Sequence, residues 1–216
     1  MKYDFTTVMD RLGKDAMAVD LPASGEDGGF FAGAKVKEGF SIIPMWVADM
    51  NFPTVPAVPK ALMERAAHPA YGYFRPPKAY YDAVIRWHEE RYGTLGLTPE
   101  CIGYENGVLG GVVSALKIFC QPGDSIVVQS PTYIGFTHCA EDNGWKLVLN
   151  PLMQDRDGVW RIDYGDLERK LSGGDIHTAI FCSPHNPSGR VWEDWEIRKL
   201  MELYRKYDVF VVSDEI

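Results

Sequence analysis

The stretch TAIFCSPHNPSGRVWEDWEIRKLMELYRKYDVFVVSDEI, residues 178–216, decides the fold class. It starts with the apolar run 178–183 and closes with the apolar run 209–213, and unbroken apolar runs of this length are typical of strands buried on both faces. Between the two runs, residues 193–208 place four apolar side chains on one helical face, namely Ile197, Leu200, Met201 and Tyr204. A strand, a helix and a second strand in this order predict a crossover unit with two parallel strands.

Further strands and helices are predicted upstream of this unit. The apolar runs SIVVQS (125–130) and WKLVLN (145–150) are two more candidate strands. Residues 76–93 show aromatic and apolar side chains at helical spacing, with prolines at the start and a glycine at the end. Residues 109–120 form a second helical pattern, which ends before a Pro-Gly pair. Together these elements predict an α/β fold with a mostly parallel sheet.

The first 50 residues differ from the rest. They include the glycine-rich stretch SGEDGGFFAGAKVKEGF (24–40), which has neither helical nor strand periodicity and is predicted to be a loop. We therefore expect residues 1–50 to form an N-terminal arm and residues 51–216 to form the main domain. The chain ends at Ile216, directly after an apolar run, which favours the interpretation that it is the front part of a longer protein with an incomplete sheet.

Composition excludes several classes of protein. With 22 Lys and Arg against 30 Asp and Glu, the formal net charge is −8, which argues against a nucleic-acid partner. No run approaches the roughly 18 consecutive apolar residues of a membrane span, and the N-terminus has acidic residues where a signal peptide needs an apolar run. We therefore expect a cytoplasmic protein without a membrane partner. The 4 cysteines lack C-x-x-C pairing, so we expect buried free thiols and no metal site.

Ligands of open α/β sheets bind beyond the carboxyl ends of the strands. That rule directs attention to four segments: ENGVLGG (105–111), SPTY (130–133), SPHNPSGR (183–190) and DEI (214–216). The first of them precedes a helix, so the backbone N–H groups of Val108 and Leu109 are candidate donors to a phosphate at the positive helix end. The segment lacks the dinucleotide and nucleoside-triphosphate signatures, and a plain glycine-rich turn is the alternative.

Two side chains in the next segments are candidate ligand contacts. Tyr133 lies at the mouth of the predicted sheet, where its ring could stack on a flat ligand, although packing over a strand end is an equal alternative. Asn186 precedes a proline and therefore adopts extended or turn geometry, from which its amide could donate to a ligand oxygen. An Asx turn that holds its own backbone is the alternative for this residue.

Asp214 is the sharpest candidate. It directly follows the apolar run VFVVS (209–213), and a carboxylate buried there without a partner would be costly. A protonated heterocyclic nitrogen of a ligand would supply the missing cation. The competing interpretation is a helix N-cap after the strand.

The order SPTY, SPHNPSGR and VVSDEI at successive strand ends resembles the large domain of the fold-type I pyridoxal-phosphate enzymes, the aspartate aminotransferase superfamily. Other segments resemble its MalY/PatB branch of cystathionine β-lyases, also called C–S lyases: YDFTTVMDRLGKDAMAVD (3–20), IIPMWVADMNFP (42–53), HPAYGYFRPP (68–77) and ENGV (105–108). The resemblance covers nearly the whole chain. It implies a three-layer α/β/α large domain and assigns the N-terminal arm to a small domain.

The resemblance also implies roles for the candidate residues. Asp214 would pair with the pyridinium nitrogen of pyridoxal 5'-phosphate, Asn186 would bind the 3-oxygen of the ring, and Tyr133 would stack on the ring face. The backbone amides of Val108 and Leu109 would hold the phosphate. Tyr73 would reach the phosphate of a neighbouring subunit, which implies a homodimer.

The chain departs from the family pattern in two places. Asn51 stands where the branch usually has aspartate, which bears on substrate preference rather than on cofactor binding. The catalytic lysine of the family is expected beyond Ile216, so no catalytic residue is assigned within this chain and the 216-residue chain alone is expected to be inactive. Three lysines precede Asp214 and are interpreted as solvated surface charges: Lys170, Lys199 and Lys206.

The function implied by the resemblance is a C–S β-lyase. Such an enzyme would cleave cystathionine or a related cysteine thioether to pyruvate, ammonia and a thiol. A class I/II aminotransferase is the alternative within the superfamily, and a non-catalytic regulatory or scaffold protein is the alternative from another class.

Overall fold

The computed structural model describes residues 3–24, 37–40 and 43–216, so most of the predicted glycine-rich loop lies outside the described residues. The chain divides into two compact units, Met1–Arg75 and Pro76–Ile216. The domain boundary expected after residue 50 stays a prediction.

The first unit contains α1 (Met17–Ser24) and α2 (Ala57–Ala66). Arg11 links two separate segments of this unit. Its Nη2 donates to Asp49 Oδ2 over 2.8 Å, and its Nη1 donates to Asn51 Oδ1 over 3.2 Å. The residue singled out as a departure from the family pattern is therefore a partner of this arginine.

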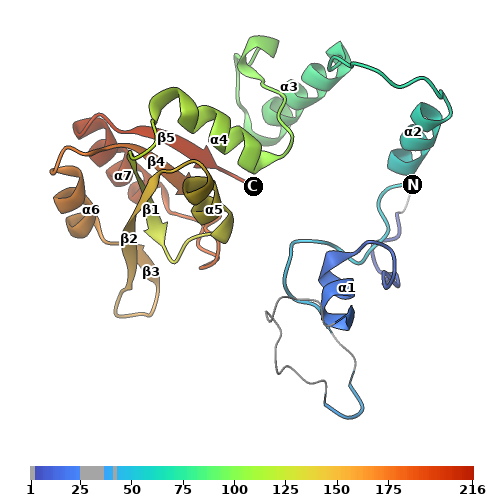
Figure 1. The fold of residues 1–216 in the computed structure, drawn as a ribbon, viewed down its shortest axis with the longest axis horizontal. Coiled ribbons are helices and arrows are strands. Elements are labelled where there is room, and N and C mark those ends of the chain that lie inside the picture. Colours follow the sequence, from blue (N-terminus) through green and yellow to red (C-terminus); the bar gives the residue numbers. More distant parts are fainter. Residues whose placement is uncertain (1–2, 25–36, 41–42) are drawn as a thin grey trace. The chain divides into compact units, whose positions relative to one another are not determined.

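A five-stranded sheet forms the centre of the second unit (Figure 1). Its strands lie in the order β3-β2-β1-β4-β5, and all neighbours are parallel except β2 and β3. The strands are β1 (Ser125–Ser130), β2 (Lys146–Gln154), β3 (Trp160–Ile162), β4 (Ile176–Cys182) and β5 (Phe210–Asp214). The predicted α/β fold with a mostly parallel sheet is confirmed.

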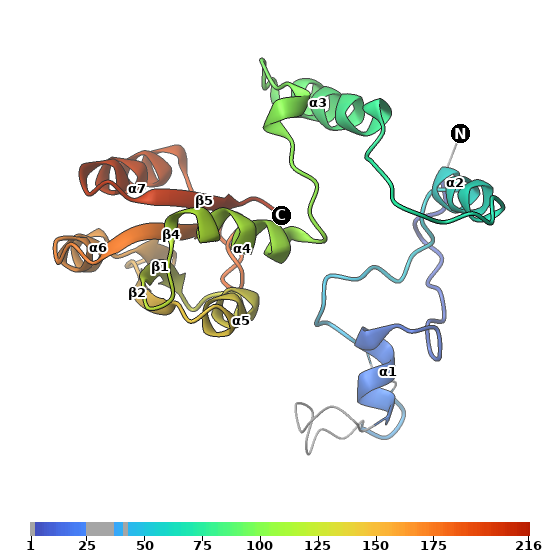
Figure 2. The ribbon, with the colours of Figure 1, turned by 45° about the horizontal axis from the view of Figure 1, so that its top comes forward.

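Helices cover both faces of this sheet, which makes three layers (Figures 1 and 2). One core contains Val127 of β1 and side chains of α6 (Tyr164–Leu171) and α7 (Asp194–Lys206). The other contains Ile126 of β1 and side chains of α4 (Val108–Phe119) and α5 (Ile134–Asp142). Successive residues of a strand point to opposite faces, so one apolar strand contributes to both cores.

The N-terminal part of the second unit holds α3 (Lys78–Tyr92) and the short helix η1 (Pro99–Cys101). The helix predicted over 76–93 is confirmed, and it ends at Gly93, whose φ of 66° is left-handed. None of the 15 residues of α3 is buried. The tilted contact between the rings of His88 and Tyr92 lies on this helix, with centroids 5.6 Å apart.

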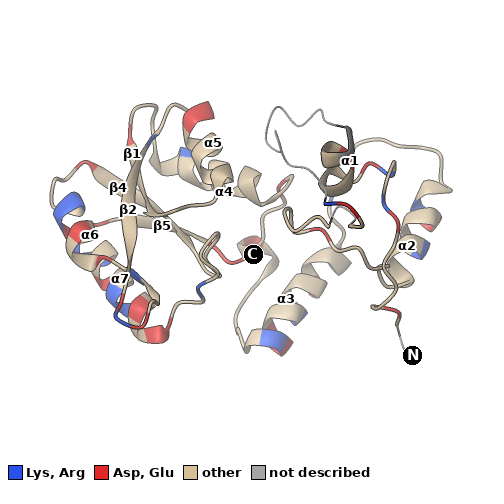
Figure 3. Ribbon diagram, turned by 90° about the horizontal axis from the view of Figure 1, so that it is seen from below, with Lys and Arg blue, Asp and Glu red and all other residues tan. Residues whose placement is uncertain are grey.

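Three surface features complete the description. Helices α6 and α7 carry both acidic and basic residues, with acidic residues in the first turn and basic residues in the last turn of each (Figure 3). An ion pair joins the two helices through Lys206 Nζ and Glu168 Oε1 at 2.6 Å. Cys120, Cys139 and Cys182 are buried free thiols as expected, whereas Cys101 is exposed because it lies on the surface helix η1. Within the described part of the chain, no helix has the length and apolarity to cross a membrane.

Candidate functional site

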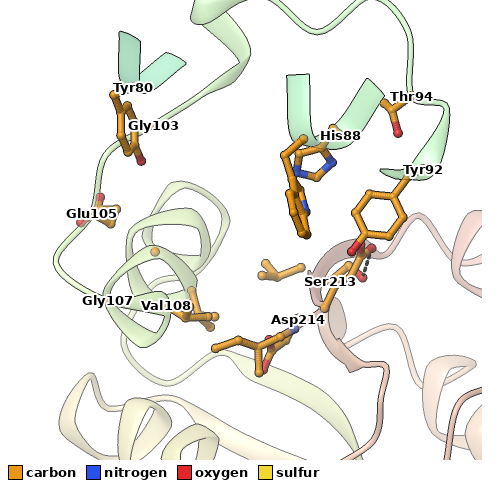
Figure 4. A pocket seen from close by; sticks show the side chains of 16 residues that line it. Tyr80, His88, Tyr92, Thr94, Gly103, Glu105, Gly107, Val108, Ser213 and Asp214 are labelled. Atoms are coloured by element: carbon orange, nitrogen blue, oxygen red, sulfur yellow. Dashed lines mark hydrogen bonds between the residues drawn. The ribbon is translucent and has the colours of Figure 1, made fainter. Parts of the chain in front are cut away.

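A cavity of about 1050 Å³ opens at the carboxyl end of β5. Its walls come from three elements: the N-terminus of α4, the end of β5 and the helix α3. Figure 4 shows Val108 and Asp214 on the sheet side, with His88 and Tyr92 of α3 across the opening. The cavity therefore lies at the edge where the sequence predicts ligand binding.

The N-terminus of α4 supplies donors to this cavity. Gly107 is the N-cap residue with a φ of 97°, a left-handed conformation that suits glycine, and it has no side chain to cap the helix. The first intrahelical bond runs from Gly111 N–H to the Gly107 oxygen at 3.2 Å. The N–H groups of Val108 and Leu109 precede that bond, so helix geometry leaves them free for a ligand anion at the positive helix end.

Asp214 is the last residue of β5 and is only 7% exposed. Its Oδ1 accepts a hydrogen bond from Ile216 N–H at 3.2 Å. Among the described residues, no Lys, Arg or His nitrogen forms an ion pair with this carboxylate. A nearly buried carboxylate with one neutral donor is suited to a cationic ligand atom.

Tyr133 is the N-cap residue of α5, with its ring edge-on to Phe136 at a centroid distance of 5.4 Å. A Cβ on Gly135 would lie 2.8 Å from Leu109 Cδ1 and would also overlap the Tyr133 ring. Only glycine therefore fits at position 135. The Tyr133 ring and Leu109, one of the two predicted phosphate-binding residues, therefore both border the space above Gly135 and pack against the same core.

Asn186 lies exposed in the loop 183–190, which follows β4. Backbone bonds close this loop: His185 N–H donates to the Arg190 oxygen, and Gly189 N–H donates to the His185 oxygen, both over 2.7 Å. The His185 Nδ1 and the Ser188 Oγ are hydrogen-bonded at 2.8 Å. Hydrogen bonds of His185, Ser188, Gly189 and Arg190 therefore close the turn, and the Asn186 side chain does not.

Cys182 connects Asn186 to Asp214. Burial raises the pKa of the Cys182 thiol, the Asn186 N–H opposes that rise, and the negative charge of Asp214 adds to it. The sulfur therefore has the Asn186 backbone and the Asp214 carboxylate as neighbours. Cys182 also pairs in register with Asp214 across β4 and β5.

The structure brings the candidates together in part. Val108 and Asp214 line one cavity, whereas Leu109, Tyr133 and Asn186 are not among the residues that line it. Tyr73 is fully exposed and belongs to the first unit, whereas the cavity belongs to the second.

Sequence reasoning missed the wall that α3 contributes. Its helical pattern is visible in the sequence, but its place across the cavity from the end of β5 depends on the tertiary fold, and His88 and Tyr92 give no local signal. Lys170, interpreted as a solvated surface charge, is only partly exposed. Its Nζ donates to the Leu149 oxygen at 2.7 Å and pairs with Asp166, because both acceptors lie within reach of its partly buried stem.

Comparison with known proteins places this site in a family. The profile of the aminotransferase class I and II family matches residues 42–216. Cystathionine beta-lyase PatB of Bacillus subtilis (strain 168) is 44% identical over 174 residues, which cover 81% of this chain and 44% of that protein. Protein MalY of Escherichia coli (strain K12) is 28% identical over 215 residues, which cover 99% of this chain and 52% of that protein.

Solved structures agree with this result. The PLP-bound C–S lyase from Staphylococcus hominis has a TM-score of 0.84 at 31% identity, and the match covers 100% of this chain and 52% of that one. Cystalysin from Treponema denticola, which contains pyridoxal 5'-phosphate, has a TM-score of 0.85 at 30% identity over the same shares, 100% and 52%. The chain spans about half the length of the relatives it matches. It belongs to the aminotransferase class I and II family.

Proposed function

We propose that this chain is the cofactor-binding part of a pyridoxal-phosphate-dependent C–S β-lyase. The whole protein would cleave cystathionine or a related cysteine thioether to pyruvate, ammonia and a thiol. The observation that carries the proposal is the nearly buried carboxylate of Asp214, which shares a cavity with the N-terminus of α4. The names of PatB and of the Staphylococcus hominis lyase support the choice of reaction.

The residues fit this cofactor by charge. Pyridoxal phosphate has an anionic phosphate at one end and a basic ring nitrogen at the other. The cavity offers backbone donors at Val108 and a carboxylate at Asp214, which match these two ends. When bound, the group supplies an electron-accepting ring that stabilises negative charge on the α-carbon of an amino-acid substrate.

Each candidate residue then has a defined task. Asp214 holds a proton on the ring nitrogen, and its burial strengthens that interaction because little water competes. The backbone amides of Val108 and Leu109 bind the phosphate. Asn186 donates to the 3-oxygen of the ring, and Tyr133 packs against the ring face from its position beside Leu109.

The lysines of this chain are not proposed as catalytic groups. Lys170, Lys199 and Lys206 lie on α6 and α7, and none of them lines the cavity. Lys199 Nζ lies 4.3 Å from the centroid of the Tyr164 ring, and the other two form ion pairs. The amine that removes the α-proton is therefore not proposed within residues 1–216, in line with the resemblance.

Two further properties belong to the proposal. The whole protein is a cytoplasmic homodimer that acts on a small thioether, without nucleic-acid or membrane partners. Tyr73 reaches the cofactor phosphate of the neighbouring subunit, which its full exposure permits. Sedimentation of the whole protein tests the dimer, and a monomer at micromolar concentration would contradict it.

Pyruvate release tests the reaction. The whole protein, loaded with pyridoxal phosphate, is incubated with cystathionine, and pyruvate is measured by coupled reduction. The expected result is pyruvate in step with a free thiol. Failure to form pyruvate from cystathionine or other cysteine thioethers rejects the lyase.

An aminotransferase is the second candidate. The family profile carries that name, and a putative aminotransferase from Clostridium difficile 630 has a TM-score of 0.85 at 29% identity. Amino transfer that depends on an added keto acid, with little pyruvate from thioethers, would favour it. A protein that stays colourless with pyridoxal phosphate would instead favour a non-catalytic role.

A further inference from the structure

A fully buried carboxylate lies outside the cavity. The side chain of Glu196, in the first turn of α7, is 0% exposed. Its Oε1 accepts from Arg161 Nη1 at 3.0 Å, and its Oε2 accepts from Glu193 N–H at 2.9 Å and from Arg190 Nη2. Arg161 in turn donates from Nε to Asp155 Oδ2 at 2.9 Å. Arg161 Nη1 also donates to Glu193 Oε1 at 3.0 Å. Two arginines and three carboxylates (Asp155, Glu193 and Glu196) thus form one network.

Arg190 is the last residue of the loop 183–190, which carries Asn186. Its backbone oxygen accepts the His185 N–H bond that closes the loop. Two residues further on, Trp192 donates from Nε1 to the Cys182 oxygen at 2.9 Å, and the Arg190 guanidinium lies over the Trp192 ring at 5.2 Å. Both ends of the loop therefore lie near the end of β4. The Arg190 side chain fixes the position of the C-terminal end of the loop.

This network is a poor source of net stability. Burying charged groups removes their hydration, and apolar replacements of buried ion pairs often cost nothing. Within the described residues, the Arg190 Nε is also buried without a hydrogen-bond partner, which is a further cost. The network instead fixes the positions of its side chains. A carboxylate shared by two guanidinium groups can keep all its hydrogen bonds in few arrangements only.

We propose that Arg190 and Glu196 are positioning residues, which hold the loop 183–190 in the one conformation that presents Asn186 to the cofactor. The claim that Asn186 is presented to the cofactor rests on the proposed function. The claim that Arg190 and Glu196 hold the loop does not. The chain of contacts runs from Glu196 through the Arg190 side chain and backbone to His185, the residue before Asn186.

Hydrogen exchange of the loop amides tests the hold. The His185 and Gly189 N–H groups report on loop opening, and β1 amides such as that of Val127 report on global unfolding. The double variant Glu196→Leu with Arg190→Leu removes the shared ion pair and leaves Arg161 its contacts with Asp155 and Glu193. We expect at least about tenfold faster exchange at the loop amides with little change in β1. Arg190→Lys, which keeps the charge, should restore much of the protection.

A matched control lies on the same helix. Asp194 and Arg198 form an exposed pair, with Nε and Oδ2 2.6 Å apart, and Asp194→Leu with Arg198→Leu should leave the loop amides unchanged. Loop exchange at the wild-type rate in the Arg190 and Glu196 double variant overturns the proposal. So does equal acceleration at the loop and in β1, because that result means a loss of overall stability only.

The link to the cofactor has its own measurement. The dissociation constant for pyridoxal phosphate, measured by fluorescence quenching, should rise about tenfold in the double variant, since each tenfold change reflects the loss of one positioned hydrogen bond. Faster loop exchange with unchanged affinity overturns the presentation of Asn186. If the wild-type protein does not bind pyridoxal phosphate, the proposed function fails, and the exchange experiment still decides whether the pair holds the loop.

Discussion

The backbone N–H of Ser183 donates a hydrogen bond to the backbone oxygen of Asp214 over 2.9 Å. This contact joins the start of the Asn186 loop to the strand end that carries the buried carboxylate. Next to this contact, Cys182 of β4 and Asp214 of β5 are paired residues of the parallel sheet. Asp214, assigned to the ring nitrogen, and Asn186, assigned to the 3-oxygen, therefore follow from adjacent strands, and the sheet sets the relative position of the two strand ends.

We predict that Gly135→Ala destabilises the protein by about 1–3 kcal/mol, because the new methyl group would overlap the Tyr133 ring and Leu109 in a packed core. Urea unfolding followed by circular dichroism measures the change. Gly110→Ala is the matched helical control, since its Cβ would meet only Glu105 Oε2 at an ordinary 3.7 Å. That variant should be neutral or more stable by up to about 1 kcal/mol. Equal effects of the two variants would contradict the packing of Tyr133 on Leu109.

The fold was more predictable from sequence than the site. The run 125–130 matches β1 in both bounds because its four middle residues are buried and three of them, Ile126, Val127 and Val128, are apolar and contribute to both faces. Helix α5 lies where a helical stretch between two apolar runs is expected, but its bounds could not be given, although Phe136, Cys139 and Ala140 have the spacing of a buried helical face. A glycine and a threonine within the segment weaken that pattern.

The site depends on contacts that no local pattern contains. Asp214 could be singled out, because a carboxylate that directly follows an apolar strand is costly to bury without a cation. Glu196 could not, because a glutamate in the first turn of an amphipathic helix is usually solvated. Its burial follows from Arg161 and Arg190, which reach it from other elements.

Alkaline pH should weaken the fold through Tyr204. Burial raises the pKa of Tyr204 to about 12, whereas an unfolded tyrosine titrates near 10. The folded state therefore binds more protons between these values, so the stability is fully present below pH 10 and is lost as the pH rises toward 12. We expect a loss on the order of 2 kcal/mol over this range from this residue.

Unfolding free energies measured from pH 9 to 11.5 check this expectation. Tyr204→Phe should flatten the curve, although it also removes the acceptor of the Gln129 Nε2 bond at 3.3 Å. Tyr81→Phe, on the surface-exposed helix α3, serves as the control and should leave the slope unchanged. If the unfolding free energy of Tyr204→Phe falls with pH as steeply as that of the wild type, Tyr204 is not the source of the alkaline loss of stability.

Asn51→Asp should leave cofactor binding intact. The new carboxylate would face Arg11, which already pairs with Asp49 at 2.8 Å, so the change adds an exposed ion pair worth less than about 1 kcal/mol. We expect the affinity for pyridoxal phosphate to stay within about fivefold of wild type, since 1 kcal/mol corresponds to a factor of about five. The relative rates with different thioethers should shift instead. A large loss of cofactor affinity would contradict the assignment of Asn51 to substrate preference.

The most direct test of the central claim is the dissociation constant for pyridoxal phosphate of Asp214→Asn, compared with that of Glu215→Gln. Both residues line the cavity, but Asp214 is 7% exposed, whereas Glu215 is exposed and accepts a hydrogen bond from Ser213 Oγ at 3.0 Å. If Asp214 holds the proton of the ring nitrogen, Asp214→Asn weakens binding at least about tenfold, and Glu215→Gln changes it little. Equal affinities in the two variants, or wild-type affinity in Asp214→Asn, would contradict the account.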